Sequence, residues 1–308
     1  MVGGHVFGLK KFDPDEALDY VGKHRITFLA GATATFNAMA ISQKERRRDL
    51  SSLRLIHSMG SPASSREFLL WHGVFTEHVV NSYGTTETAS TLCLRSDIHP
   101  IKEKAGSAGR PFVFVQARVV KLDEENRRIE PNELVPKDGK EMGQIISRSP
   151  GMFDGYHNRP EEEVKKRYKG WFYTGDTATW DEDGFITVQG RTGDMFVSGG
   201  ENIFPQPMEE VLGKHPKVRE CVVVGMPDEK WGQIAVAFVV PGDEMPTAEE
   251  LDRHCLNDPD LANYKRPRRY YLVDQIPYTA TGKKLRYKMK QLANSENQKF
   301  IPAPFSKH

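Results

Sequence analysis

Four short segments place glycines beside polar side chains directly after apolar runs, and these segments are the candidates for chemistry. The first, NSYGTTE at residues 81–87, offers an aromatic ring, two hydroxyls beside a glycine and a carboxylate. This set suits a nucleotide, because Tyr83 could stack on a base, the threonine hydroxyls could contact phosphate and Glu87 could hold Mg²⁺. Taken alone, the segment fits a polar turn that caps a strand equally well.

The second and third segments offer an aspartate and flexible backbone. FYTGD at residues 172–176 ends in Asp176 after a tight turn, and one carboxylate could accept both hydroxyls of a ribose. GRTGD at residues 190–194 and SGGE at residues 198–201 are rich in glycine, which lets the backbone approach a ligand closely or absorb a rotation between domains. A turn aspartate and a plain linker are the alternatives.

The fourth segment, PYTATGK at residues 277–283, presents one lysine before a basic helical pattern. It is not a P-loop, because no glycine lies five residues before Gly282 and Lys284 replaces the Ser or Thr that would hold Mg²⁺. Lys283 on such a loop can act as a mobile point charge toward a carboxylate and a phosphate. A solvated surface lysine is the alternative.

An α/β layer is expected to position the first segment. Asp13 and Pro14 begin the helical pattern EALDYVGKH, and the apolar run ITFLAGAT follows it as a buried strand. The segments SSLRLIHSMGSPAS and HVVNSYGTTETAS repeat the passage from an apolar run into a turn. Helices and strands that alternate in this way indicate an α/β fold with functional loops at the strand ends.

The pattern of apolar runs and turn residues changes twice further along the chain. After Gly106, short runs such as FVFVQARVVKL, GQIISRS and GFITVQG are separated by turn and charge clusters, which predicts a small antiparallel β-rich subdomain. From Met208 the pattern is helix, strand, strand, helix, strand and basic helix over about 100 residues, the size of a compact α+β module. The expected fold class is therefore α/β plus a β-rich subdomain plus a small C-terminal α+β domain.

Composition excludes several classes of protein. The 308 residues suggest about two domains. The 43 Lys+Arg and 42 Asp+Glu leave a net charge of +1, so no overall field attracts nucleic acid. The longest apolar runs are far shorter than the roughly 20 residues that cross a bilayer. The N-terminus carries no secretory pattern and the three cysteines are too far apart for CxxC spacing, so we expect a cytoplasmic protein with reduced thiols.

In this order, the four segments resemble the adenylate-forming superfamily of acyl-CoA synthetases, peptide-synthetase adenylation domains and luciferases. The resemblance covers essentially the whole chain, from FDPDEAL through SMGSPAS, NSYGTTE, FYTGD, GRTGD, SGGENIFP and VVGMPDEKWGQ to PYTATGKK. It implies a fold like that of acyl-CoA synthetases. Three parts follow: residues 1–104 as part of the large AMP-binding domain, residues 105–190 as its β-rich subdomain, and residues 191–308 as a mobile C-terminal domain with its hinge near Asp194.

The resemblance also implies the role of each site residue. Tyr83 with Gly84 would form the adenine side of a nucleotide site, Thr86 would contact the α-phosphate and Glu87 would hold Mg²⁺. Asp176 would bind the ribose. The resemblance assigns the loop that lines the adenine site to Gly60, Ser61 and Pro62. It assigns a contact with the ribose and phosphate to Arg191, and it identifies Lys283 as the catalytic lysine. The loop near CoA would comprise Ser198, Gly199, Gly200 and Glu201.

The implied reaction is a two-step ligation with ATP, Mg²⁺ and CoA. A carboxylate, from a medium-chain or long-chain fatty acid or an aryl acid, attacks the α-phosphate of ATP, and CoA then displaces AMP from the acyl-adenylate. SGGENIFP resembles the version found in CoA ligases, and Val197 stands where peptide-synthetase domains usually carry a lysine, so CoA is favoured over a carrier-protein thiol.

One family feature is missing from the sequence. The Ser/Thr/Gly-rich phosphate loop that ends in Pro-Lys-Gly, upstream of YGxTE in the family, does not occur here. We therefore expect a chain that lacks the N-terminal part of a usual synthetase. The alternative function is a catalytically incomplete chain that only binds AMP or an acyl-adenylate, or that needs a complementing N-terminal chain. A homodimer is the other expected partnership; neither nucleic acid nor a membrane span is expected.

Overall fold

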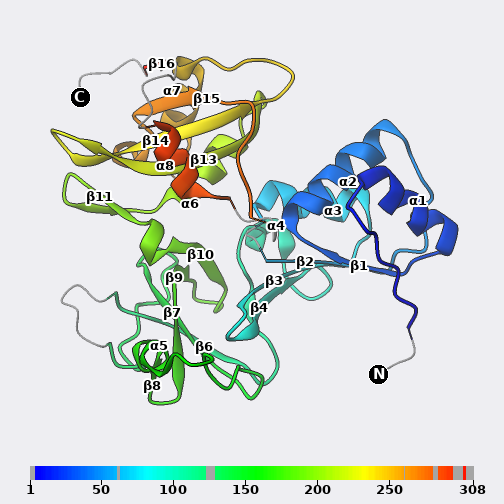
Figure 1. Cartoon of the computed structure of the whole chain (residues 1–308), viewed down its shortest axis with the longest axis horizontal. Helices are drawn as coiled ribbons and strands as arrows, with labels where there is room; N and C mark the ends of the chain where they lie inside the picture. Colours follow the sequence, from blue (N-terminus) through cyan, green and yellow to red (C-terminus); the bar gives the residue numbers. More distant parts are fainter. Residues whose placement is uncertain are drawn as a thin grey trace. The chain divides into compact units, whose positions relative to one another are not determined.

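The computed structural model describes residues 4–60, 63–122, 129–259, 261–279 and 284–293 and the backbone of residues 301–302. The chain divides into two compact units, and Figure 1 shows the elements of both. The first unit comprises Met1–Ala117, Ser147–Pro160 and Asp183–Thr187. The second comprises Arg118–Ile146, Glu161–Glu182 and Val188–His308.

The first unit is built on a five-stranded sheet in the order β1-β2-β3-β4-β5. The first three strands are parallel, and the last two run antiparallel to their neighbours. The strands are β1 (Phe28–Gly31), β2 (Leu55–Met59), β3 (Val79–Thr85), β4 (Ala89–Arg95) and β5 (Arg110–Pro111). The helices of the unit are α1 (Pro14–His24), α2 (Thr33–Glu45), α3 (Ser65–Val74) and α4 (Ile101–Lys104).

Helices α1, α2 and α3 lie on one side of strands β1 and β2 (Figure 1). The core between these layers contains Phe36, Ile56, Phe68, Trp71 and Val79, each at most 2 % exposed, together with other apolar side chains. Local signals fix where the helices begin. The Asp13 side chain accepts a hydrogen bond from the backbone of α1, and α3 begins with a capping box that pairs Ser64 with Glu67.

A second sheet has the order β10-β9-β7-β6, with β8 paired to β9. Its elements are β6 (Gln116–Val120), β7 (Gly143–Arg148), α5 (Pro160–Lys166), β8 (Arg167–Tyr168), β9 (Trp171–Trp180) and β10 (Ile186–Arg191). One expectation here is wrong in its bounds. The run FVFVQARVVKL becomes a strand only from Gln116, because Phe114 takes a left-handed φ of 66° in a turn and is 85 % exposed.

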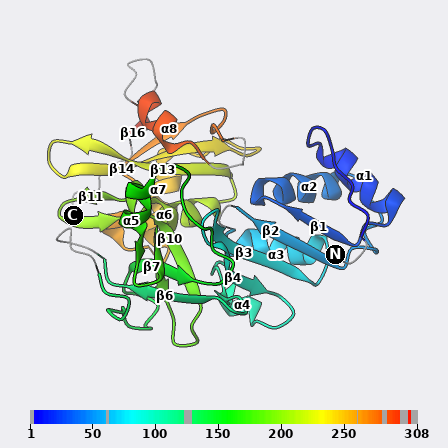
Figure 2. The ribbon, with the colours of Figure 1, turned by 60° about the horizontal axis from the view of Figure 1, so that its bottom comes forward.

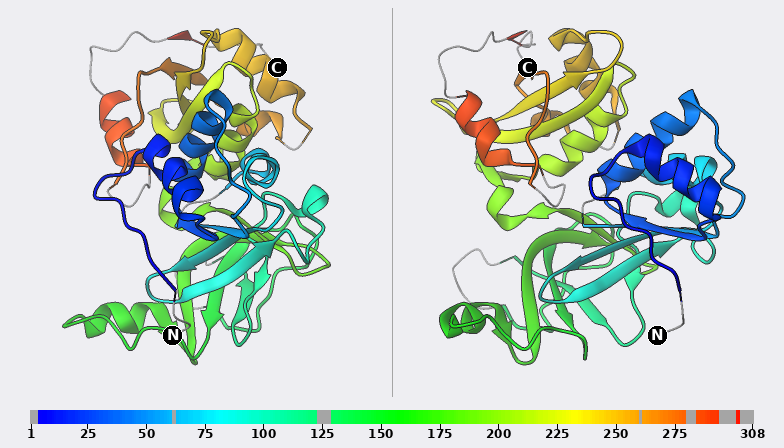
Figure 3. Two further views of the ribbon diagram at one scale, coloured as in Figure 1. Left: turned by 90° about the vertical axis from the view of Figure 1, so that its right-hand side faces the viewer. Right: turned by 45° about the vertical axis from the view of Figure 1, so that its right-hand side comes forward.

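The C-terminal α+β module is the rest of the second unit. Its elements are η1 (Thr192–Asp194), β11 (Phe196–Ser198), β12 (Glu201–Ile203), α6 (Pro205–Gly213), β13 (Val218–Asp228), β14 (Gly232–Pro241), α7 (Ala248–Asn257), η2 (Asn263–Lys265), β15 (Arg269–Leu272), α8 (Arg286–Ala293) and β16 (Ile301–Pro302). Strands β13 to β16 form one sheet in sequence order. Figure 2 shows α8 on one side of β13 and β14 and α6 and α7 on the other, and Figure 3 shows the arrangement from two further directions.

The predicted fold class is confirmed: an α/β layer, a β-rich part and a small C-terminal α+β module. The longest helix described, α2, has 13 residues. Within the described ranges, every helix is too short or too polar to cross a membrane.

Candidate functional site

The predicted nucleotide segment covers the end of β3, which contains Gly84, and the first residues of the turn to β4. Gly84 is required there, because a Cβ at this position would lie 1.8 Å from the carbonyl oxygen of Ala89. The turn is closed by Thr85 and Thr88: the Thr85 amide donates to Thr88 Oγ1 at 3.1 Å, and the Thr88 amide donates to the Thr85 carbonyl at 3.2 Å. This tight turn leaves Thr86 exposed and Tyr83 half-buried.

Glu87 is held from a distant part of the chain. Its Oε1 accepts a hydrogen bond from the hydroxyl of Tyr156 at 2.7 Å, and its carbonyl accepts one from the amide of Phe153 at 2.9 Å. The rings of Tyr156 and Phe153 pack edge to face. Neither aromatic residue was a candidate from sequence, because no local pattern links residues 153–156 to the turn at residue 87.

The residues present fit a magnesium ion that arrives with a nucleotide. In the described part of the chain, no group of three or more His, Cys, Asp or Glu side chains could hold a metal by itself. Mg²⁺ at phosphate sites needs only one or two carboxylates, because phosphate oxygens and waters complete its octahedron. A single fixed carboxylate at Glu87 therefore matches this chemistry, whereas a separate protein cage does not.

Gly60 lies at the same edge of the sheet as the nucleotide turn. It directly follows β2, which is parallel to β3, with Met59 opposite Ser82 in the register. Parallel neighbours end at one edge, so Gly60 and the turn after β3 lie at the same edge of the sheet. Ser61 and Pro62, the other predicted residues of this loop, lie outside the described residues.

The structure brings Asp176 and Arg191 together, although the sequence places them in separate motifs. Asp176 lies in β9 and is 5 % exposed, and Arg191 ends β10. The Nε of Arg191 lies 3.2 Å from Oδ1 of Asp176. Thr177 Oγ1 also donates to the carbonyl of Gly190 at 3.0 Å, which fixes the two strands at this point. A buried carboxylate and a largely exposed guanidinium thus form one polar pair.

The predicted CoA loop is a hairpin turn between β11 and β12. Ser198 pairs with Glu201, and Gly199 and Gly200 between them have φ values of 60° and 89°. A two-residue hairpin turn of type I′ requires two such positive φ values, which explains the paired glycines. The amide of Gly199 donates to the carbonyl of Trp231 at 2.9 Å, and a Cβ on Gly199 would lie 2.8 Å from the indole.

Trp231 is a neighbour that the sequence did not single out. It is 43 % exposed, and the ammonium of Lys230 lies 4.9 Å from the centre of its ring. Its only sequence signal is its place in the segment VVGMPDEKWGQ. The glycine turn and the exposed indole therefore form one surface of the C-terminal module.

Lys283 lies outside the described residues, but both flanks of its loop are described. Tyr278 and Lys284 form an isolated antiparallel bridge, and the amide of Leu285 donates to the carbonyl of Pro277 at 2.8 Å. The two described flanks of the loop are therefore held against each other. Asp194, the predicted hinge, ends the short helix η1, and its Oδ2 lies 3.4 Å from Nε of Arg286.

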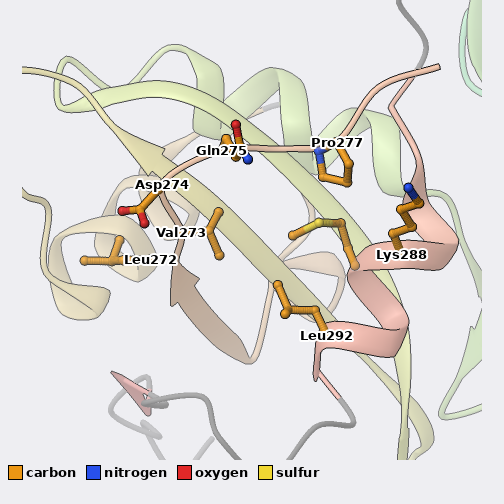
Figure 4. A pocket seen from close by; sticks show the side chains of 8 residues that line it. Leu272, Val273, Asp274, Gln275, Pro277, Lys288 and Leu292 are labelled. Carbon is orange, nitrogen blue, oxygen red and sulfur yellow. The ribbon is translucent and has the colours of Figure 1, made fainter. Parts of the chain in front are cut away.

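A pocket of about 440 Å³ lies beside this loop (Figure 4). It is formed by the segment after β15 and by α8, and its lining includes Val273, Pro277, Met289, Leu292, Asp274 and Lys288. None of the predicted site residues that the structure describes lines it. Within the C-terminal module, the lining of the pocket therefore differs from the CoA loop at residues 198–201.

Comparisons with known proteins agree with the motifs. The AMP-binding enzyme family matches residues 1–157, and the AMP-binding enzyme C-terminal domain matches residues 207–283. A feruloyl-CoA synthase from Amycolatopsis sp is 36% identical over 287 residues, which cover 92% of this chain and 55% of the relative. The chain spans about half the length of the curated relatives it matches.

Two solved structures are similar at comparable identity. An amide bond synthetase from Marinactinospora thermotolerans matches with a TM-score of 0.82 and 30% identity, over 92% of this chain and 56% of that one. An o-succinylbenzoate CoA synthetase from Bacillus subtilis, in complex with its acyl-adenylate intermediate, matches with a TM-score of 0.77 and 30% identity, over 94% and 55%. The resemblance inferred from the motifs is confirmed, and the chain belongs to the AMP-binding enzyme family of adenylate-forming proteins.

Proposed function

We propose that the chain carries the machinery of an AMP-forming acyl-CoA ligase. In this reaction a carboxylate attacks the α-phosphate of ATP, pyrophosphate leaves, and the thiol of CoA then displaces AMP from the acyl-adenylate. The observation that carries the proposal is the pair of family matches, which together span the nucleotide turn and the Lys283 loop. Relatives with CoA synthase or synthetase in their names support CoA as the acceptor.

The proposed nucleotide-binding residues lie in the turn after β3 of the first unit and, in the second unit, in the polar pair on β9 and β10. Tyr83 would stack on adenine, and Thr86 would contact the α-phosphate. Asp176 would bind the ribose, and Arg191, which pairs with it, would contact the ribose or phosphate. Glu87 would hold the Mg²⁺ that accompanies the nucleotide, and this ion would offset phosphate charge when bound.

Lys283 is proposed to act at the reacting atoms. Its ammonium would stabilise the negative charge that builds on the α-phosphate as the carboxylate attacks. The bridge between Tyr278 and Lys284, which holds the flanks of the loop together, supports a fixed attachment of this loop to the C-terminal module. Residues 191–308 would then turn about Asp194, so that Lys283 leaves and Ser198, Gly199, Gly200 and Glu201 approach the pantetheine of CoA.

An aromatic acid is the proposed substrate class. The names of two similar proteins, the feruloyl-CoA synthase and the o-succinylbenzoate CoA synthetase, support an aryl acid over a fatty acid. His57 lies beside the nucleotide turn in the sheet, and its Nε2 lies 2.8 Å from Oγ of Ser82. Burial lowers the pKa of His57, which favours an uncharged, hydrogen-bonded wall for a neutral ring.

We place the chain in the cytoplasm as part of the same proposal. All three cysteines, Cys93, Cys221 and Cys255, are free and buried. Unpaired thiols are the expected state of cysteines in a reducing compartment.

The test is pyrophosphate release by the purified chain with ATP, Mg²⁺, CoA and a panel of aromatic and aliphatic acids. We expect release with an aromatic acid and a loss of roughly 10²-fold or more in Lys283→Ala, the scale of losing one transition-state donor. Lys288→Ala is the matched control, because Lys288 is an exposed lysine on the adjacent helix α8. Equal rates in Lys283→Ala and the parent chain would contradict the assigned role.

A second arm separates binding from turnover. If no pyrophosphate appears but a non-hydrolysable acyl-adenylate analogue raises the melting temperature, the chain is a binding protein that needs a complementing chain. If pyrophosphate is released only when an amine replaces CoA, the acceptor assignment is wrong, and the chain behaves as the name of the similar amide bond synthetase suggests.

A further inference from the structure

The connector, residues 190–195, comprises the end of strand β10 and the short helix η1, and it leads into the core of the C-terminal module. It is held at both ends. On one side Arg191 pairs with Asp176, and Thr192 Oγ1 donates to the carbonyl of Gly175 at 3.1 Å. On the other side Asp194 Oδ2 lies 3.4 Å from Nε of Arg286 in α8. The first residue after the connector, Phe196, is 3 % exposed and belongs to the core of the module.

Arg286 is fixed independently of the connector. Its Nη2 donates to Oε2 of Glu209 at 3.0 Å, and its Nη1 donates to Oε1 of the same carboxylate and to the carbonyl of Val223 at 2.9 Å. The Val223 amide also donates to Glu209 Oε1 at 2.7 Å. Guanidinium is a planar fork, so these contacts aim its remaining nitrogen, Nε, at Asp194.

The carboxylate that fixes Arg286 stays charged. The Glu209 side chain is 11 % exposed. Burial alone would raise its pKa, but the charges of Arg286 and Lys284, together with hydrogen bonds from Arg286 and the Val223 amide, lower the pKa of Glu209. The anchor below Arg286 is therefore a buried, fully hydrogen-bonded ion pair, which is costly to break.

The residue that follows Lys283 is held at the same buried ion pair of Glu209 and Arg286. Lys284, the next residue, donates from Nζ to the carbonyl of Cys221 at 2.6 Å and lies 4.0 Å from Glu209. Its backbone closes the loop with Tyr278. Arg286 therefore stands on one rigid base, two residues from the loop-closing bridge and in contact with the connector.

We propose that Arg286 is a positioning residue that latches the connector onto the base of the Lys283 loop through Asp194. The Asp194 side chain is 38 % exposed, so water screens this pair and allows it to open and close again. When it opens, Arg286 keeps its place because Glu209 holds it. Only the catalytic meaning of this movement rests on the proposed function; the latch itself does not.

The test is limited proteolysis of the full chain with trypsin, scored by mass spectrometry for the cut after Arg191. Asp194→Asn removes the charge at an exposed site and leaves the Glu209 anchor intact. We expect the cut after Arg191 to accelerate about two- to fivefold, the scale of a partly exposed ion pair. Asp194→Glu, which keeps the carboxylate, should restore most of the parental rate.

Two controls separate a latch from general loosening. Arg253→Gln breaks the exposed pair with Glu249 on α7 and should leave the connector cut unchanged. Raising the salt concentration should accelerate the connector cut in the parent chain, relative to the cut after exposed Lys11, but not in Asp194→Asn. An unchanged cut in Asp194→Asn, or equal acceleration at all tryptic sites of the module, would overturn the proposal.

Arg286→Lys gives an independent arm, because lysine keeps the charge but cannot contact Glu209 and Asp194 together. We expect it to accelerate the connector cut at least as much as Asp194→Asn. Proteolysis needs no turnover, so a chain without ligase activity can still show the latch. In an active chain, Asp194→Asn should change the ratio of acyl-adenylate formation to thioester formation. A normal ratio together with an unchanged cut would reject the latch and leave the proposed ligase function in place.

Discussion

The sheet of the first unit and the four-stranded sheet of the C-terminal module differ in how their faces are covered. In the C-terminal module, alternate residues of β13 and β14 enter two separate cores: Val223 and Ala237 belong to one, and Val222 and Phe238 to the other. In the first unit, Ile56 and Ser58 of β2 are fully buried, whereas the residues between and beside them are half-buried or exposed. Phe28 of β1 is 48 % exposed.

This difference in burial matches a difference in the role of the two sheets. A sheet covered on both faces reads as an unbroken apolar run, as in CVVV and IAVAFVV. Its strands carry no site residue, and its function is to hold loops rigidly at its ends. The first sheet keeps polar side chains such as Asn81, Ser82 and His57 within its strands, which places binding chemistry on the sheet itself.

The largest expected effect contrasts one residue type in the two sheets. Phe238 is fully buried and stacks on Tyr271 with ring centres 5.0 Å apart. Phe238→Ala should destabilise the C-terminal module by about 3–5 kcal/mol, whereas Phe28→Ala should cost at most about 1 kcal/mol. Urea unfolding followed by fluorescence measures both. Similar losses would show that the two sheets are buried alike.

A second contrast uses two glycines of the first unit. Gly84→Ala would place a Cβ against the backbone of Ala89, so the turn must distort; we expect a loss of about 2 kcal/mol and loss of AMP binding. Gly73→Ala is the control, because nothing lies within 4 Å of its added Cβ in helix α3. That variant should be neutral or up to about 1 kcal/mol more stable. Calorimetric titration with AMP distinguishes them, and normal binding by Gly84→Ala would refute the role of the turn.

The alkylation rates of the three cysteines allow the two units to be compared without mutation. Burial raises the pKa of Cys221 and Cys255 in the module to about 12, and it also raises the pKa of Cys93 in the first sheet, which is 8 % exposed. Because the thiolate is the reactive form, labelling at pH 8 should be slow for all three and about tenfold or more slower for the module pair. Peptide mapping after timed alkylation measures this. Faster labelling of Cys255 than of Cys93 would reverse the comparison.

The smallest effect concerns the capping box of α7. A hydrogen bond from the Thr247 backbone, with help from Lys217, lowers the pKa of Glu250 from 4.5 to about 2. A lowered carboxyl pKa stabilises the fold above pH 4.5, and this contribution disappears as the pH falls toward 2. Glu250→Gln should therefore flatten the fall of melting temperature across this window. Glu249→Gln, one residue away, is the control. An equal change in both variants would contradict the assignment of this pH dependence to Glu250.

Much of the site could be predicted because its signals are local. Gly199 and Gly200 indicate a turn that needs positive φ, Gly84 indicates a close approach of two strands, and the apolar runs indicate strands. The bounds near residues 112–116 could not be predicted, because Val113 and Phe114 have strand propensity but lie in an exposed turn. Tertiary packing overrides propensity at such places.

The sequence by itself determined the family, the order of the elements and the loops that carry chemistry, because each depends on residues close together in the chain. Only the tertiary structure decided which distant side chains meet: Tyr156 with Glu87, Arg191 with Asp176, and Arg286 with Glu209 and Asp194. These contacts depend on strand register and on how helices pack over the sheets. No periodicity encodes them, because the partners are separated by up to 92 residues, as between Asp194 and Arg286.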